Sequence, residues 1–169
     1  MDASYLQRRF LLSFAGRKLP HIFTDVLVIG SGAGGMRAAI EASSAASVIV
    51  LTKGKIPDSN TYNAQGGLAA VLAPSDTIEQ HLDDTIEAGR GMCDETIVRR
   101  VIESAPEHIR EMYAQGMEFD VAGDDLALGR EGGHSAWRVV HAAGDASGRI
   151  LVDFLTRQVA ACEEIKTFE

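Results

Sequence analysis

The 169-residue chain carries 16 lysines and arginines against 24 aspartates and glutamates, a formal net charge of −8. Apolar residues make up 46% and charged residues 24%, ordinary globular proportions that exclude a disordered chain. The acidic balance, without a basic stripe, predicts neither nucleic acid nor an anionic membrane surface as a partner. Cys93 and Cys162 lie far apart in the chain, which predicts free thiols in a reducing compartment.

The N-terminus is predicted to be a basic extension over residues 1–23, with the folded domain spanning 24–169. Arginines at positions 8 and 9 precede a short apolar run, as in a twin-arginine signal. Basic residues at positions 17 and 18 interrupt that run, and no small-residue cleavage site follows. No apolar run reaches the roughly 18 residues of a membrane span, so we expect a cytoplasmic protein.

A β-α-β pattern opens the domain. Residues 25–29 are a β-branched apolar run typical of a strand buried on both faces, and residues 48–51 predict a second such strand. The Ala-rich stretch 33–46 between them predicts the crossover helix that parallel strands require. Residues 150–162 predict a late helix, and 165–168 begin another strand. The fold class is therefore α/β, Rossmann-like with a parallel sheet, incomplete at the C-terminus.

The middle of the chain predicts helices joined by irregular segments. Asp76 is placed to cap a helix ending near residue 88, and Asp94 to begin the next. A capping-box pair at positions 104 and 107 surrounds Pro106, which predicts a separate helix from that point. The glycine-rich stretch 123–148 is predicted to be loop.

A glycine fingerprint follows the first strand. The first glycine permits a tight turn, the second lets a pyrophosphate approach the backbone, and the last lets helix and strand pack closely. Phosphates would bind at the helix N-terminus, where free N–H groups and the dipole favour negative charge. A glycine-rich turn that binds nothing is the alternative, but the strand–turn–helix context favours dinucleotide binding. The fingerprint consists of Gly30, Ser31, Gly32, Ala33, Gly34 and Gly35.

The end of the second strand departs from the simple NAD fingerprint. That fingerprint expects an acidic residue there to hold the ribose hydroxyls, whereas this chain has Thr52 and Lys53. Both residues could donate to the adenosine end of a cofactor, or Lys53 could be only a surface charge. The departure argues against a plain NAD dehydrogenase.

Two further motifs lie downstream. The first is rich in small residues suited to backbone contact with a flat ring, although by itself it also fits an ordinary loop. It comprises Asn60, Thr61, Tyr62, Asn63, Ala64, Gln65, Gly66 and Gly67. The second is the string Arg-Glu-Gly-Gly-His-Ser at 130–135, followed by His-Ala-Ala-Gly-Asp-Ala-Ser-Gly-Arg at 141–149. Its charged and imidazole groups stand on flexible backbone, where binding residues are common.

Together, from about Arg17 onward, the three motifs resemble the L-aspartate oxidases of the succinate dehydrogenase and fumarate reductase flavoprotein family. The resemblance implies that residues 24–169 are the N-terminal part of an FAD-binding domain. Residues 31–34 would form the pyrophosphate loop, Lys53 would lie on the adenosine side, and residues 60–67 would lie along the isoalloxazine.

Two positions discriminate within this family. Relatives that attach FAD covalently use a histidine just before the threonine of the loop, where this chain has Asn60. The resemblance therefore implies non-covalent FAD. Glu131 occupies a position at which the dicarboxylate enzymes lack an acid, and its carboxylate would pair with a substrate α-ammonium and repel succinate or fumarate. Glu131 is the substrate-binding candidate, with a solvated loop charge as the alternative.

The resemblance implies FAD-dependent oxidation of L-aspartate to iminoaspartate, the first step of de novo NAD biosynthesis, with quinolinate synthase as the next enzyme. Hydride passes to the flavin, and oxygen or fumarate reoxidises it. The catalytic arginine and the capping domain would lie beyond this chain, so no catalytic residue is assigned within it. The alternatives are a fumarate reductase or succinate dehydrogenase flavoprotein, and a truncated flavin-binding fragment without turnover.

The remaining candidates are interpreted as structural. His134 and His141 are expected to form structural hydrogen bonds, and Trp137 is expected to have a packing role and not to be a cofactor platform. The residues interpreted as surface or solvated helix-face positions are His21, His81, His108, Asp83, Asp84, Glu163 and Glu164.

Overall fold

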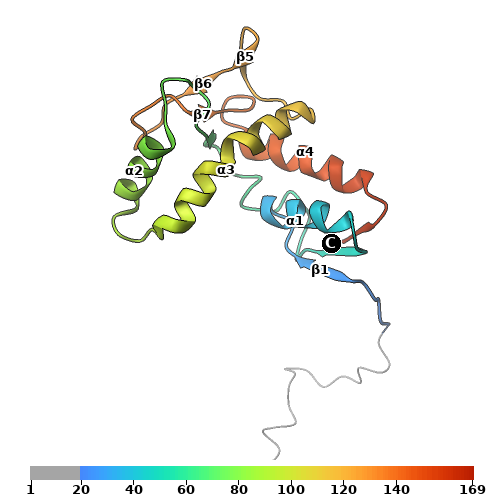
Figure 1. The fold of residues 1–169 in the computed structure, drawn as a ribbon. Helices are drawn as coiled ribbons and strands as arrows, with labels where there is room; N and C mark the ends of the chain where they lie inside the picture. The colour runs from blue at the N-terminus through green and yellow to red at the C-terminus, as the bar shows by residue number, and fades with distance from the viewer. Residues whose placement is uncertain (1–19) are drawn as a thin grey trace, which may run out of the picture.

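The computed structural model describes residues 20–169, so residues 1–19, most of the predicted extension, lie outside the described part. A three-stranded parallel sheet in the order β1-β2-β8 confirms the predicted α/β class. Its helices lie side by side over one face (Figure 1). The elements of this half are β1 (Val26–Ile29), α1 (Ala33–Ser43), β2 (Val48–Leu51), α4 (Ser147–Ala161) and β8 (Ile165–Phe168).

The core lies between this sheet and its two helices. Val48 and Val50 of β2 point toward the helices and are 1% exposed. They meet Met36 of α1 and Phe154 of α4, both buried in the same apolar cluster. Each buried side chain of this size contributes about 1.5–3 kcal/mol through the hydrophobic effect, so the contacts hold the β-α-β unit together.

The opposite face of the sheet is exposed at its edges among residues 20–169, although Ile49 in its centre is 8% exposed. Leu27 and Ile29 of β1 are 54% and 79% exposed, and Leu51 and Phe168 extend the apolar surface onto β2 and β8. The expectation of strands buried on both faces is therefore wrong for β1. Its residues alternate between partly buried and exposed because helices pack on one side only among residues 20–169.

A second group of elements surrounds a small antiparallel sheet in the order β3-β7-β6. Val140 pairs with Leu68 on one side and with Leu128 on the other. Within the predicted loop 123–148, short strands occupy residues 125–126, 128–129 and 139–140, and most of the remainder is irregular as expected. The elements are β3 (Leu68–Ala69), α2 (Ile78–Gly89), α3 (Glu95–Ala114), β4 (Val121–Ala122), β5 (Asp125–Leu126), β6 (Leu128–Gly129) and β7 (Val139–Val140).

The helix α3 runs without a break through Pro106, so the predicted separate helix is wrong. The Ser104 hydroxyl donates back to the Val101 carbonyl at 3.1 Å, within the preceding turn, instead of capping a new one. The helix begins as expected, because the Asp94 carboxylate accepts hydrogen bonds from the backbone N–H groups of Thr96 and Ile97.

The boundaries of α2 and α4 also differ from the prediction. Thr77 caps α2, with its hydroxyl accepting from the Gln80 N–H at 3.1 Å, and Asp76 is buried elsewhere. The helix α4 begins at Ser147 and not at residue 150. Within residues 20–169, no helix is both long enough and apolar enough to cross a membrane.

Candidate functional site

The glycine fingerprint forms a tight turn from β1 into α1. Gly30 has φ +109°, a conformation that favours glycine, and its N–H donates to the Leu51 carbonyl at 2.8 Å. A Cβ on Gly35 would collide with the Gly30 carbonyl oxygen. Both glycines therefore have the structural roles expected of them, namely the turn and the close approach of helix to strand.

The N-terminus of α1 is open to a ligand. Its N-cap residue, Gly32, provides no side-chain cap, and the first turn contains no acidic residue. A Cβ on Gly34 would meet nothing within 4 Å, so the space beside this turn is clear. The first-turn N–H groups other than that of Ala33, which donates to Thr61, together with the helix dipole and the clear space beside Gly34, suit the pyrophosphate of a dinucleotide.

The turn is tied to two other segments. The Ser31 side chain is buried and donates to the Thr52 hydroxyl at 3.2 Å, at the end of β2. The backbone N–H of Ala33 donates to Thr61 Oγ1 at 3.1 Å. The structure thus brings the start of the second motif against the first, although 28 residues separate the two partners.

The second motif, residues 60–67, is held in place mainly through its backbone. The Gly148 N–H, at the start of α4, donates to the Ala64 carbonyl at 3.0 Å. A Cβ on Gly148 would collide with the Thr61 carbonyl, and one on Gly67 would collide with the Val140 carbonyl. Glycine at both positions allows the segment to lie against α4 and β7.

Most candidate cofactor residues of this region are accessible. Lys53 is exposed at the end of the parallel sheet. Thr61, Tyr62 and Gly67 are half-buried, and the other members of the second motif are exposed. Those exposed members are Asn60, Asn63, Ala64, Gln65 and Gly66.

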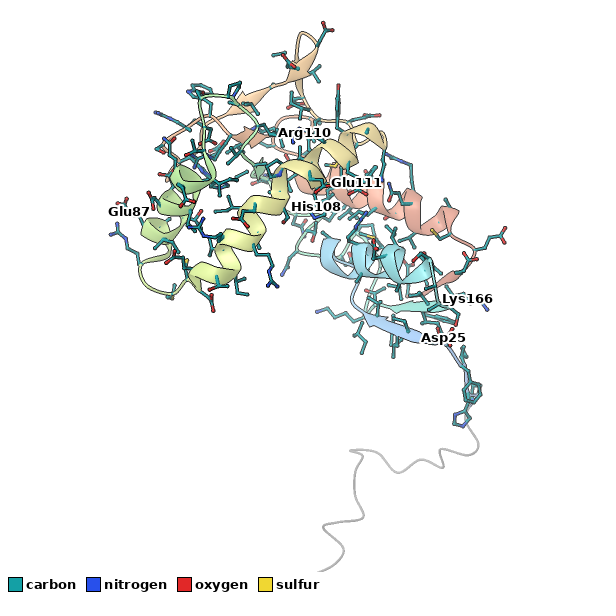
Figure 2. The ribbon with its side chains drawn as sticks, in the orientation of Figure 1. Asp25, Glu87, His108, Arg110, Glu111 and Lys166 are labelled. Carbon is teal, nitrogen blue, oxygen red and sulfur yellow. The ribbon has the colours of Figure 1, made fainter. Side chains whose placement is uncertain are left out.

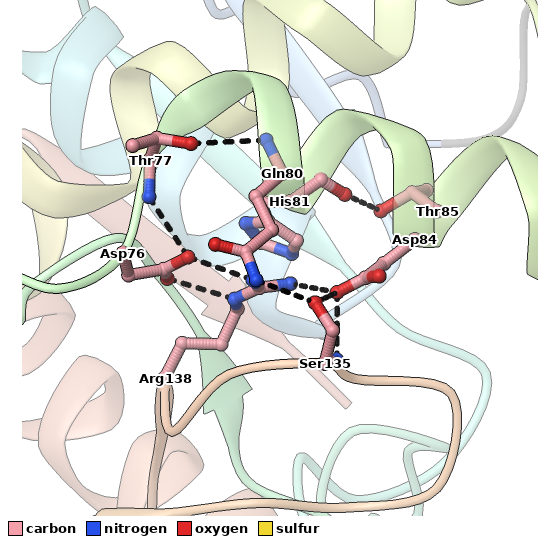
Figure 3. A network of polar contacts seen from close by, with 8 residues as sticks. All are labelled: Asp76, Thr77, Gln80, His81, Asp84, Thr85, Ser135 and Arg138. Carbon is pink, nitrogen blue, oxygen red and sulfur yellow. Dashed lines mark hydrogen bonds and ion pairs between the residues drawn. The ribbon is translucent and has the colours of Figure 1, made fainter.

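A buried ion-pair network holds the third motif (Figure 3). Arg138 is fully buried and donates to both oxygens of Asp76, at 2.7 and 2.8 Å, and to Asp84 Oδ2 at 2.6 Å. The N–H and hydroxyl of Ser135 also donate to Asp84, at 2.8 and 2.7 Å. The loop 130–138 is therefore fastened to α2 at one end by charge-assisted hydrogen bonds.

Asp84 is therefore not the solvated helix-face residue that the sequence suggested. Its side chain is 16% exposed. Burial alone would raise the pKa of this carboxyl, but the Ser135 hydrogen bonds and Arg138 outweigh burial and lower it below 3.8. The carboxylate thus stays charged at neutral pH and holds the loop.

Two histidines meet beside this network. His81 is 5% exposed, so its predicted surface position is wrong, and its ring lies 5.7 Å from that of His134. The Nδ1 atoms of both are buried without a hydrogen-bond partner among residues 20–169. Burial, reinforced by Arg138 and His134, lowers the pKa of His81 and keeps it neutral. Trp137 is 62% exposed, contrary to the predicted packing role.

Glu131 lies on the exposed part of the same loop. Its side chain is 58% exposed, and its Oε1 atom lies 3.3 Å from Nε2 of His141. Glu131 makes no contact with Arg138. Its carboxylate is therefore accessible to a small cation from solvent. Residues 20–169 contain no cluster of three or more side chains able to hold a metal ion.

Outside these motifs, α1 and α3 contact each other through exposed polar groups. His108 and Glu111 lie on the side of α3 toward α1 (Figure 2), where Glu111 accepts from Arg37 at 3.4 Å. His108 is exposed, as expected, and its Nδ1 atom lies 3.5 Å from Glu111. We therefore assign it no functional role.

Known proteins resemble the chain both in sequence and in fold. It is 46% identical over 147 residues to an L-aspartate oxidase of Oryza sativa subsp. japonica, covering 86% of the chain and 23% of that protein. An L-aspartate oxidase of Streptomyces coelicolor is 45% identical over 142 residues, covering 83% of the chain and 24% of that protein. The chain thus spans about a quarter of the length of these relatives.

The fold is similar to that of solved flavoprotein structures. A quinol fumarate reductase of E. coli superposes with a TM-score of 0.81 at 27% identity, covering 86% of the chain and 26% of that structure. Sdh1 of Mycobacterium smegmatis gives 0.80 at 28% identity, covering 86% and 27%. Residues 25–169 match the FAD binding domain family. The chain therefore belongs to the FAD-binding domain family of succinate dehydrogenase and fumarate reductase flavoproteins, and its cofactor is FAD.

Proposed function

We propose that the protein carrying this chain oxidises L-aspartate to iminoaspartate with FAD, the first step of de novo NAD biosynthesis. The supporting observation is 45–46% identity to L-aspartate oxidases over more than four fifths of the chain. Because the chain spans about a quarter of those relatives, the activity belongs to the complete protein. The proposal includes a cytoplasmic location, a link to quinolinate synthase, and reoxidation by oxygen or fumarate.

In this proposal the chain holds FAD without a covalent bond. The open N-terminus of α1 binds the pyrophosphate, Lys53 contacts the adenosine side, and residues 60–67 lie along the isoalloxazine. When bound, FAD supplies the hydride acceptor, while the protein supplies orientation and electrostatics. Asn60 carries a carboxamide, which is not a nucleophile suited to forming the flavin bond. The fingerprint residues proposed to contact FAD are Gly30, Ser31, Gly32, Ala33, Gly34 and Gly35.

Glu131 provides amino-acid specificity in this proposal. Its accessible carboxylate pairs with the α-ammonium of aspartate through a charge-assisted hydrogen bond. Succinate lacks that ammonium and brings a second carboxylate, which Glu131 repels. In this proposal the chain thereby binds the substrate at its α-ammonium. No residue of the chain is assigned a role in proton transfer.

A dicarboxylate enzyme is the second candidate, favoured by the superposition on a quinol fumarate reductase with a TM-score of 0.81. Identity to that structure is 27%, against 45–46% to the L-aspartate oxidases. The charge of Glu131 separates the candidates, because a fumarate or succinate site gains nothing from an extra carboxylate.

The test uses the complete gene product loaded with FAD. L-Aspartate should bleach the flavin under anaerobic conditions and produce hydrogen peroxide in air, whereas succinate should do neither. Denaturation should release all the flavin from the protein. Bleaching by succinate but not by aspartate would establish the second candidate, and no bleaching by either would contradict both.

The role of Glu131 has its own variant. Glu131→Gln should raise the KM for L-aspartate roughly tenfold and improve competition by succinate, because it removes a charge-assisted hydrogen bond. Glu118→Gln, at another exposed glutamate, is the matched control and should leave both values unchanged. Equal behaviour of the two variants would contradict the assignment of Glu131.

A further inference from the structure

Beyond the proposed substrate contact, the structure pairs Glu131 with a second residue. Nε2 of His141 lies 3.3 Å from Oε1 of Glu131, and no second partner of this carboxylate is found among residues 20–169. One oxygen of the carboxylate therefore lies within ion-pair distance of the imidazole, and no contact of the other oxygen is found among residues 20–169. A carboxylate with one oxygen held in this way presents the other to a substrate cation in a defined orientation.

The two side chains meet over Gly129, outside the pairing of β6 with β7. Gly129 of β6 pairs with Val139 of β7. Continued in this register, His141 falls opposite Ala127, and Glu131 lies in the loop after β6, so neither residue is the strand partner of the other. The His141 backbone is fixed as well, because its carbonyl accepts from the Asp120 N–H at 2.8 Å.

Gly129 provides the space that the imidazole occupies. A Cβ at this position would lie 2.9 Å from Cε1 and 3.3 Å from Nδ1 of the His141 ring. The ring thus lies over the bare backbone of β6 and reaches the loop beyond it. The His141 side chain is 21% exposed and that of Glu131 is 58% exposed, so the ring is more enclosed than the carboxylate it holds.

We propose that His141 is a positioning residue for substrate specificity, which orients the Glu131 carboxylate toward the ammonium of an amino-acid substrate. In the proposed complex, Nε2–H of His141 is directed at Oε1, and Oε2 accepts from the ammonium. This role rests on the proposed function of Glu131. It predicts an effect on discrimination between L-aspartate and succinate, and little effect on the rate of hydride transfer itself.

The experiment compares substrate discrimination in the FAD-loaded complete gene product. His141→Phe should lower the preference for L-aspartate over succinate about fivefold, the effect of one lost hydrogen bond, with the loss in KM and not in kcat. His141→Gln keeps an N–H near the position of Nε2 and should restore most of the preference. His108→Phe, in the exposed pair with Glu111, is the matched control and should change nothing.

A double variant separates this inference from the role of Glu131. In the Glu131→Gln background, His141→Phe should cause little further loss, and an undiminished fivefold loss there would overturn the inference. A response to Glu131→Gln with none to His141→Phe would also overturn it, while leaving the Glu131 proposal intact. No response to either variant would contradict both proposals.

A measurement without turnover reports the contact directly. In protein labelled with ¹⁵N-histidine, the Nε2 signal of His141 should shift in Glu131→Gln, because the acceptor changes from a carboxylate to an amide. It should stay unchanged in Glu118→Gln. A His141 signal that is indifferent to Glu131→Gln would show that the two side chains are not in contact, and the inference would be wrong.

Discussion

Arg138 and Asp76 form a bidentate ion pair in which neither side chain has any exposed surface. Asp76 immediately precedes the cap of α2, and Arg138 ends the loop that carries Glu131. The pair therefore joins two segments that are 62 residues apart. A buried pair of this kind matters most when one partner is lost, since the other is left as an uncompensated buried charge.

Arg138→Met should accordingly destabilise the fold by about 3–5 kcal/mol, because it leaves Asp76 buried without its partner. Thermal unfolding of the purified protein measures the effect. Arg99→Met is the control, since Arg99 pairs with Glu79 at 2.6 Å on the exposed surface, where solvent screens the pair and its loss should change stability little. Similar losses in the two variants would contradict the structural weight given to Arg138.

His81 should make stability depend on pH. Its pKa is lowered in the folded protein, so the unfolded chain binds a proton more readily below the ordinary value of 6.5. Stability is therefore full above that value and declines as the pH falls toward the lowered pKa. His81→Phe should reduce the fall in unfolding temperature across this range. His108→Phe should retain the full fall, and an unchanged slope in His81→Phe would refute the argument.

Adjacent glycines of the second motif should respond differently to an added methyl group. Gly67→Ala places a Cβ against the Val140 carbonyl and should cost about 1–3 kcal/mol of folding free energy through overpacking. At Gly66 the same methyl meets nothing within 4 Å, so Gly66→Ala should change stability by less than about 0.5 kcal/mol. Denaturant unfolding of the two variants, measured side by side, tests the difference.

Thr61 should influence FAD affinity through the turn that it contacts. Thr61→Val removes the hydroxyl acceptor of the Ala33 N–H with little change in shape. It should raise the FAD dissociation constant about fivefold, the effect of one lost hydrogen bond. Thr61→Ser restores an acceptor and should recover most of the affinity, as measured by calorimetric titration. An FAD affinity in Thr61→Val equal to that of the unchanged protein would show that the contact does not support the cofactor site.

The parallel sheet and its crossover were predictable from local patterns. Val48 and Val50 belong to a short run of apolar residues that matches the length of β2. The turn after Ile29 has the glycine spacing G-x-G-x-x-G, which is typical of a strand that leads into a helix. The start of α3 followed equally from Asp94, whose carboxylate caps the first turn. These features depend on residues close together in sequence, so the sequence alone indicates them.

The errors share a physical cause, which is competition from distant partners. Asp76 is a good helix-capping residue, but Arg138 binds its carboxylate and Thr77 caps α2 instead. Asp84 and His81 occupy a helix face that looks polar and exposed, and the loop carrying Ser135 covers it. The contact of His141 with Glu131 depends on where the loop after β6 lies relative to β7, which the sequence does not indicate.

The central position of β7 links the two halves of the site. On one side Val140 pairs with Leu68, directly after the segment proposed to line the flavin. On the other side it pairs with Leu128, three residues before Glu131. The segments proposed to contact the cofactor and the substrate are thus neighbours of one strand, so β7 fixes the spacing between the two proposed contacts.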